Sequence, residues 1–155
     1  MYNSSIEIVH FKQIYSKYFY NLNIEWLEKY FYVEPYDEKV LSNPQKYVIN
    51  PGGYIFFAKY NEEIIGVVSL IHQKTFFELS KMAVCPKYQG LKIGQKLLDY
   101  TINFAKKKRW KSITLYSHRT LEAAIYLYRK NGFKEIPLEK EVHYERADIK
   151  MILEL

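Results

Sequence analysis

The stretch VCPKYQGLKIGQKLLDY, residues 84–100, places two glycines four positions apart where an apolar run gives way to a helical one. The first backbone N–H groups of a helix have no intrahelical partner and together carry about half a positive charge. Gly90 and Gly94 would let a ligand approach that backbone closely, and Lys92 between them adds a cation. The pattern is compatible with a pyrophosphate-binding turn and equally with an ordinary strand-to-helix turn.

A few other residues have side chains suited to acid–base or nucleophilic chemistry. Glu78 stands among apolar neighbours, where burial would raise its pKa, although pairing with a nearby Lys or Arg is the alternative. Tyr128 lies on an apolar helical stripe and by spacing alone is a core ring. Cys85 precedes Pro86 and has no sequence-evident His or Asp partner, so a cysteine acyl-enzyme is not expected. The histidines have no metal-ligand spacing, which argues against a metal site.

Length and charge limit the possible classes of protein. A chain of 155 residues fits one domain, residues 1–155, and its formal charge of +6 indicates an anionic partner such as nucleic acid, an acidic membrane surface or a phosphorylated cofactor. The densest basic run, residues 106–111, ends a predicted helix and is not accompanied by an interleaved aromatic motif of the RNA-binding type, so nucleic-acid binding ranks last. Without a membrane-length apolar run or a signal peptide, and with one cysteine, the chain is expected to be cytoplasmic.

The glycine turn follows a series of three strand candidates. These are residues 53–60, 63–72 and 75–84, joined by two-residue turns, and they predict an antiparallel meander. Apolar residues at helical spacing then predict a helix over 93–105.

The remaining elements complete the pattern. A strand (5–11), a helix (15–32) and at most one short helix between Pro35 and Pro44 precede the meander; a strand (112–117), a helix (120–131) and two strands (133–136 and 146–155) end the chain. This order predicts an α/β fold with a mixed, mostly antiparallel sheet of about seven strands and helices on both faces. The helix that crosses over after the meander requires at least one parallel strand pair.

Two segments carry a family resemblance. ELSKMAVCPKYQGLKIGQKLL, residues 78–98, resembles the cofactor-binding segment of the GNAT acyltransferase family, and AAIYLYRKNGFKEI, residues 123–136, resembles its second segment. Lys92 departs from the pattern, because the family normally has its first signature glycine there. Two segments at this separation are much more specific than either alone.

The resemblance implies a GNAT-like domain that moves an acetyl group from acetyl-CoA to an amine by direct attack. The residues that it implies for the cofactor are Met82, Ala83, Val84, Gln89, Gly90, Leu91, Lys92, Ile93, Gly94, Gln95, His118, Ala124 and Tyr128. A side chain at Lys92 narrows the approach to the backbone, while its ammonium could pair with a phosphate. A non-catalytic acyl-CoA sensor on the same fold is the alternative.

The resemblance also implies roles in catalysis. Glu78 matches the position of a general base, and Tyr128 matches a tyrosine near the departing sulfur, whose hydroxyl could protonate the thiolate. The acceptor is expected at the first helical region, the loop before the Gly52–Gly53 turn and the last loop, with Trp26, Tyr30 and Glu34 as the main candidates and Glu139 and Glu141 as further ones. No metal and no membrane partner are expected, and a homodimer is compatible with the sequence.

Overall fold

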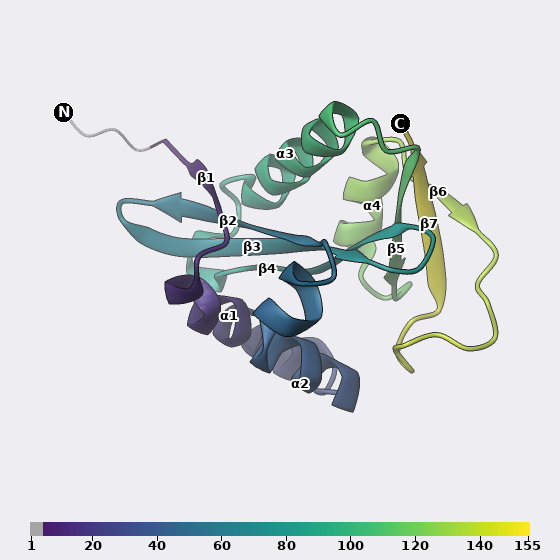
Figure 1. The fold of residues 1–155 in the computed structure, drawn as a ribbon, viewed down its shortest axis with the longest axis horizontal. Helices are drawn as coiled ribbons and strands as arrows, with labels where there is room; N and C mark the ends of the chain where they lie inside the picture. Colours follow the sequence, from purple (N-terminus) through teal and green to yellow (C-terminus); the bar gives the residue numbers. More distant parts are fainter. Residues whose placement is uncertain (1–4) are drawn as a thin grey trace.

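The computed structural model describes residues 5–155 as one mixed sheet with helices on both faces (Figure 1). The strands are β1 (Glu7–His10), β2 (Tyr54–Tyr60), β3 (Glu63–His72), β4 (Phe77–Val84), β5 (Ser112–Ser117), β6 (Lys134–Ile136) and β7 (Ile149–Glu154), and the helices are α1 (Ser16–Tyr30), α2 (Pro35–Ser42), α3 (Ile93–Lys107) and α4 (Glu122–Lys130). The strand order is β1-β2-β3-β4-β5-β7-β6, and among the neighbouring pairs of these described strands only β4 and β5 are parallel. The predicted seven-stranded α/β fold, with a parallel pair after the crossover, is confirmed.

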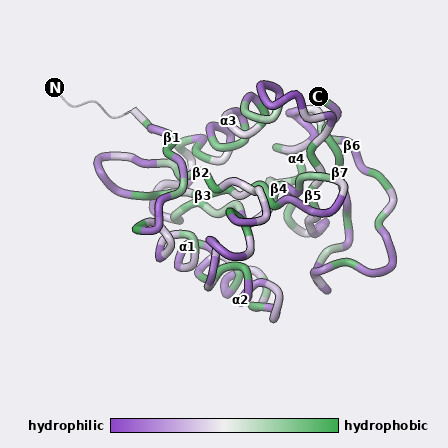
Figure 2. Tube along the Cα trace, viewed as in Figure 1, coloured by the Kyte–Doolittle hydropathy of each residue, from purple (hydrophilic) through white to green (hydrophobic). Residues whose placement is uncertain are grey.

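The sheet separates two apolar cores. On one face it packs against α3 and α4, and on the other against α1 and α2. The buried side chains of α3 recur every three or four residues, from Ile93 through Leu97 and Thr101 to Ala105, which is the spacing of one helical face. Hydrophilic residues gather at the β2–β3 tip and in the loop between β6 and β7 (Figure 2). Among the described helices, none combines the length and apolarity needed to cross a membrane.

The segment between α1 and β2 is more helical than the sequence pattern indicated. In place of at most one short helix, it forms α2 and then a π-helical turn at Gln45–Ile49. Pro35 is tolerated at the start of α2 because the first N–H groups of a helix need no intrahelical acceptor. Glu34 and Asp37 form a reciprocal capping box there, with a bond of 3.0 Å from the Glu34 N–H to Asp37 Oδ2.

The two turns of the meander differ. Asn61 and Glu62 form the predicted two-residue turn, both with positive φ (48° and 65°), as the hairpin twist requires. The second turn is longer than predicted, because β4 begins at Phe77 and the Gln73 N–H bonds to the carbonyl oxygen of Phe76 at 2.8 Å.

Two irregularities in β4 determine where a ligand can enter the sheet. Strand β4 pairs with β5 only at Glu78–Thr114 and Leu79–Leu115, after which the strands separate. On its other edge, β4 has an extra residue between the pairs Val67–Ala83 and Ser69–Ser80, a bulge in which Lys81 has φ 54°. Bulges of this kind redirect side chains and interrupt pairing next to binding sites.

Candidate functional site

A cavity of about 570 Å³ lies where β4 and β5 separate. Its walls come from Leu79–Val84 of β4, the end of β5, the glycine turn with the start of α3, α4, α1 and the loop between β6 and β7. Because α3 and α4 cover one face of the sheet and α1 covers the other, the cavity passes through the sheet. Two ligands could therefore approach from opposite faces and meet at the bulge of β4.

The start of α3 presents unpaired backbone donors to this cavity. Lys92 is the N-cap residue, and its carbonyl oxygen accepts the Lys96 N–H at 3.0 Å, the first bond of the helix. No side chain among the described residues caps this end, so the N–H groups of Ile93, Gly94 and Gln95 have no intrahelical acceptor. These three residues line the cavity. The arrangement suits an anion.

The two glycines leave space for a ligand at this turn. Gly90 has φ 91°, and a Cβ added there would meet nothing within 4 Å. A Cβ at Gly94 would lie 3.7 Å from Leu127 Cδ2, an ordinary contact, so packing does not require glycine at this position. Lys92 and Lys130 contribute cations to the walls. The turn fits the pyrophosphate of a coenzyme A derivative.

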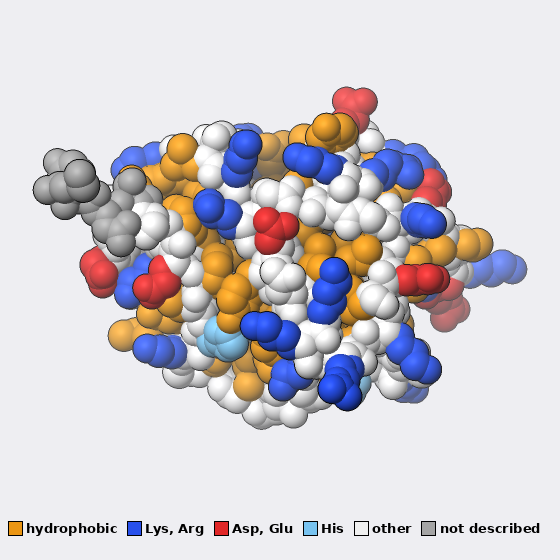
Figure 3. All heavy atoms as spheres, turned by 90° about the horizontal axis from the view of Figure 1, so that it is seen from above, with side chains coloured by type: hydrophobic (Ala, Val, Ile, Leu, Met, Phe, Trp, Pro, Cys, Tyr) orange, Lys and Arg blue, Asp and Glu red, His pale blue; other side chains and the backbone are white. Residues whose placement is uncertain are grey.

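Lys92 has the backbone conformation that explains why a glycine is usual at this position. Its φ and ψ of 58° and 33° are left-handed, a region that costs a residue with a Cβ about 1–2 kcal/mol. The lysine therefore carries a conformational cost at this position that a glycine would not. Lys and Arg side chains are scattered over the whole α3 face, where acidic ones are few (Figure 3).

Tyr128 of α4 lies in the wall of the cavity. Its ring packs against Phe133 at 5.8 Å between centroids, and the residue is 8% exposed. Burial raises the pKa of its hydroxyl to about 12, so the hydroxyl carries its proton at neutral pH. It can therefore donate a hydrogen bond to an anion that forms in the cavity.

Glu78 does not line the cavity but is connected to it. The carboxylate is 1% exposed; it accepts hydrogen bonds from Gln73 Nε2 at 2.9 Å and from the Tyr144 hydroxyl at 3.0 Å. The Tyr144 oxygen is also 3.1 Å from Ser80 Oγ, and both of these residues line the cavity. Burial raises the pKa of Glu78, against the lowering effect of these bonds and of the Lys81 charge. Tyr144 thus links a carboxylate of raised pKa to the cavity.

A buried ion cluster, Glu34, Asp37, Lys81 and Arg146, supports the wall on the α1 and α2 side. Asp37 Oδ1 is 2.5 Å from Lys81 Nζ, and Arg146 Nη1 is 2.7 Å from Asp37 Oδ2 and 2.9 Å from Glu34 Oε2. Burial alone would raise the pKa of Asp37, but the hydrogen bonds of Arg146 and the charge of Lys81 lower it. The cluster fastens the β6–β7 loop to α2 and to the bulge of β4.

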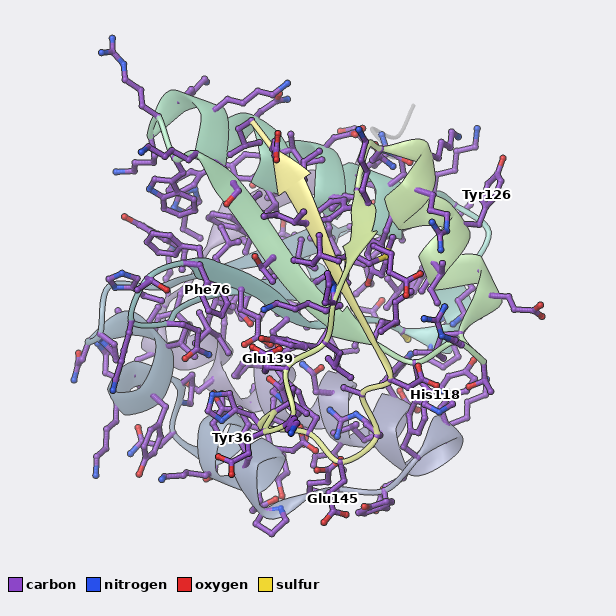
Figure 4. The ribbon with its side chains drawn as sticks, turned by 90° about the vertical axis from the view of Figure 1, so that its right-hand side faces the viewer. Tyr36, Phe76, His118, Tyr126, Glu139 and Glu145 are labelled. Carbon is purple, nitrogen blue, oxygen red and sulfur yellow. The ribbon has the colours of Figure 1, made fainter. Side chains whose placement is uncertain are left out.

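The loop between β6 and β7 reaches down to α2 in Figure 4. Tyr36 and Glu145 lie where the loop meets α2, whereas Tyr126 projects from α4 on the other face of the sheet. His118 lines the cavity; its Nδ1 is 2.6 Å from Thr120 Oγ1 and its Nε2 is 3.4 Å from Asp148 Oδ2. These contacts fix the imidazole at the end of β5.

Most of the residues predicted for the site lie together in this cavity. Those that line it are Trp26, Met82, Ala83, Val84, Gln89, Gly90, Lys92, Ile93, Gly94, Gln95, His118, Ala124 and Tyr128, whereas Tyr30, Glu34, Glu78 and Leu91 do not. Tyr30 and Leu91 are exposed. Glu34 is engaged by Arg146 and by the backbone N–H of Glu145, so an acceptor would have to break these bonds to reach it.

The acidic residues predicted for the last loop also lie away from the cavity. Glu139 accepts bonds from the Tyr116 hydroxyl and from Lys150, and Glu141 is exposed. The sequence reasoning missed Asp37, Lys81, Tyr144 and Arg146. The capping-box pattern at Glu34 and Asp37, and a lysine in the middle of the strand before the glycine turn, were the local signals that could have identified part of this group.

Comparison with known proteins assigns this arrangement to a family. Residues 12–133 match the family model described as acetyltransferase (GNAT) family. The fold is similar to a GNAT-family acetyltransferase from Staphylococcus aureus, with 25% identity, a TM-score of 0.85 and coverage of 97% of this chain and 99% of that one. It is also similar to a GNAT-family acetyltransferase from Elizabethkingia anophelis with acetyl-CoA bound, with 25% identity, a TM-score of 0.65 and coverage of 97% and 98%.

Curated relatives match over shorter stretches. The chain is 35% identical over 85 residues to a probable N-acetyltransferase 14 of Xenopus tropicalis, which is 52% of this chain and 40% of that protein. It spans less than half of the length of the curated relatives that it matches.

Proposed function

The chain belongs to the GNAT family of acetyltransferases, and from this premise we propose that it transfers the acetyl group of acetyl-CoA to an amine. The observation that carries the proposal is the cavity between β4 and β5, which has unpaired N–H groups at one end and opens on the opposite face of the sheet at the other. The acetyl-CoA in the Elizabethkingia anophelis relative supports the choice of donor.

The residues at the glycine turn have the chemistry to hold the donor. Backbone N–H groups of Ile93, Gly94 and Gln95 would bind the pyrophosphate, and Lys92 and Lys130 would add charge. Beyond Leu79 the edge of β4 that faces β5 has lost its partner strand, so its backbone groups are free to bond the thioester carbonyl and the amide groups of the donor.

The acetyl group would then be transferred by direct attack of the amine on the thioester. The nitrogen of a neutral amine bonds to the thioester carbonyl carbon, and the carbon–sulfur bond breaks. The nitrogen loses a proton, which we assign to Glu78 by way of the Tyr144 hydroxyl, the group that joins Glu78 to the cavity. The leaving thiolate accepts a hydrogen bond from the Tyr128 hydroxyl, to which we assign its stabilisation, and it takes up a proton from water as coenzyme A leaves. Acetylated amine and coenzyme A are the products.

The alternative is a sensor that binds an acyl-CoA without turnover. The left-handed Lys92 in place of glycine is the observation that favours it, because its side chain narrows the approach to the turn. Both functions require binding of acetyl-CoA, but only the transferase releases free coenzyme A in the presence of an amine.

Thermal unfolding with acetyl-CoA tests binding first. At about 100 times its dissociation constant, acetyl-CoA should add about 2.7 kcal/mol to the free energy of unfolding. An unmoved melting temperature would refute both functions. Release of free thiol in the presence of a panel of amines then tests turnover: release that requires an amine establishes the transferase, whereas binding without release establishes the sensor.

A further inference from the structure

The half of the cavity on the α1 side has aromatic walls. Trp26 and Phe31 come from α1 and its end, with 5.8 Å between ring centroids, and Tyr116 and Tyr144 come from β5 and the β6–β7 loop, with 6.4 Å between theirs. Rings in this arrangement bury large apolar areas and pack edge to face or offset against another ring. The walls therefore suit a flat apolar body.

The charges beside this half belong to the buried ion cluster, in which Lys81 and Arg146 are paired with Asp37 and Glu34. None of the described residues that line the cavity is Asp or Glu, whereas Lys81 and Arg146 are among them. The nearest carboxylates of the ion cluster, Glu34 and Asp37, are buried and already bonded to these two cations. An acceptor with several positive charges would therefore find no free carboxylate in the wall to pair with.

Arg146 has hydrogen-bonding capacity left over. Both hydrogens of its Nη1 are used, on Glu34 Oε2 and Asp37 Oδ2, and one hydrogen of Nη2 binds Asp37 Oδ1 at 3.0 Å. Within residues 5–155, neither Nε–H nor the second hydrogen of Nη2 donates a hydrogen bond. These two donors form one edge of the guanidinium fork, the geometry that binds a carboxylate with two parallel bonds. The side chain is 15% exposed and lines the cavity, so a small ligand can reach it.

We propose that the acceptor is a small aromatic compound that carries both a primary amine and a carboxylate, as an aromatic amino acid does. The ring lies between Trp26 and Phe31 on one side and Tyr116 on the other, and the carboxylate binds the free edge of Arg146. This assignment rests on the proposed acetyl transfer and specifies its acceptor.

A panel of four amines tests the assignment by thiol release from acetyl-CoA. L-phenylalanine has the ring and the carboxylate, phenethylamine lacks the carboxylate, L-alanine lacks the ring, and spermidine lacks both and carries several charges. We expect kcat/KM for L-phenylalanine to exceed that for phenethylamine by about 10- to 100-fold, the effect of hydrogen bonds to a charged group. Spermidine should be the poorest acceptor.

Replacement of one wall ring tests the aromatic half of the proposal. Trp26→Leu keeps an apolar side chain and removes the ring, so the preference for L-phenylalanine over L-alanine should fall about tenfold. Trp110→Leu is the matched control, because Trp110 packs outside the cavity against Phe77. It should leave the preference unchanged. Arg146→Lys, which keeps the charge but removes the planar edge, should abolish the preference for L-phenylalanine over phenethylamine.

Each outcome decides a separate question. Fastest release with spermidine, or equal rates for L-phenylalanine and phenethylamine, would overturn the acceptor assignment while the acetyl transfer stands. No release with any amine, although acetyl-CoA raises the melting temperature, would refute the transfer and this assignment with it. If Arg146→Lys does not fold, the panel on the unmodified protein and Trp26→Leu still decide.

Discussion

The two ends of the cavity are formed by different kinds of chemical group. At the glycine turn, the donors are backbone N–H groups of consecutive residues, and the space comes from missing side chains at Gly90 and Gly94. At the opposite end, the wall is held by side-chain charges that lie far apart in the sequence, with Asp37 bonded to Lys81 44 positions away and to Arg146 109 positions away.

This difference separates a site made of open backbone groups from one in which paired side chains hold Arg146 and Lys81 in place. The turn is open and costs little to alter, so changes there should act on binding more than on folding. The ion cluster is buried and self-paired, so changes there should act on folding first.

Breaking the ion cluster should have the largest effect on stability. Asp37→Asn leaves Lys81 without its charged partner and Arg146 with Glu34 alone, and removal of one member of a buried pair costs about 3–5 kcal/mol. Urea unfolding at pH 7 measures this loss. Glu28→Gln on the exposed face of α1 is the matched control and should stay within about 0.5 kcal/mol. A loss below about 1 kcal/mol for Asp37→Asn would contradict the division.

The same variant should change the dependence of stability on pH. The pKa of folded Asp37 is below its ordinary value of 3.8, so its stabilisation is present above that pH and is lost as the pH falls through the folded pKa. The wild-type protein should lose stability in this acid range, and Asp37→Asn should lose less. If the free energy of unfolding falls equally with pH in both proteins, Lys81 and Arg146 do not lower the pKa of Asp37.

Removal of the buried carboxylate should affect the rate without affecting the binding of acetyl-CoA. Glu78→Gln keeps the size of the side chain but cannot accept a proton, so kcat should fall about 100-fold, equivalent to about 2.7 kcal/mol. The affinity for acetyl-CoA should not change, because Glu78 does not line the cavity. Because burial raises the pKa of Glu78, wild-type activity should rise with pH through a value above 4.5. Undiminished turnover would remove Glu78 and Tyr144 from the proton path.

Filling the glycine turn should change binding and stability in opposite directions. In Gly94→Ala the new Cβ makes only an ordinary contact with Leu127, and the helix gains up to about 1 kcal/mol from alanine. The same Cβ occupies the space where a phosphate would approach, so the affinity for acetyl-CoA should fall about tenfold, about 1.4 kcal/mol. Calorimetric titration and urea unfolding of the same sample measure both effects. If affinity is unchanged, the phosphate does not lie on this turn.

The smallest effect is expected at Lys92. Lys92→Gly removes the left-handed penalty but adds freedom to the unfolded chain, so stability should rise by no more than about 1 kcal/mol. Lys92→Gln is the matched variant that keeps the penalty and removes the charge. If the ammonium contacts a phosphate, both variants should weaken the salt dependence of acetyl-CoA binding, and only the glycine variant should change stability.

The same division explains what could be predicted from the sequence. Strand β5 has the predicted bounds, residues 112–117, and the glycine turn lies where its pattern placed it, because periodicity and turns are local properties. The cluster of Asp37, Lys81 and Arg146 was missed because no local pattern pairs a helix start, a strand bulge and a loop before a final strand. The long turn before β4 was missed because Thr75 and Phe76 have high strand propensity but lie outside the pairing.

The short pairing of β4 with β5 has a mechanical consequence. Strands β1 to β4 form one half of the sheet, and β5, β7 and β6 form the other. Among the described residues, the backbones of the two halves pair only at Glu78–Thr114 and Leu79–Leu115. Amide protons on the open edge of β4 should therefore exchange with water faster than the paired amide protons of the other inner strands. A ligand whose amide groups bond to this edge would act as an added strand and slow that exchange. It would also connect the two halves of the sheet by further hydrogen bonds.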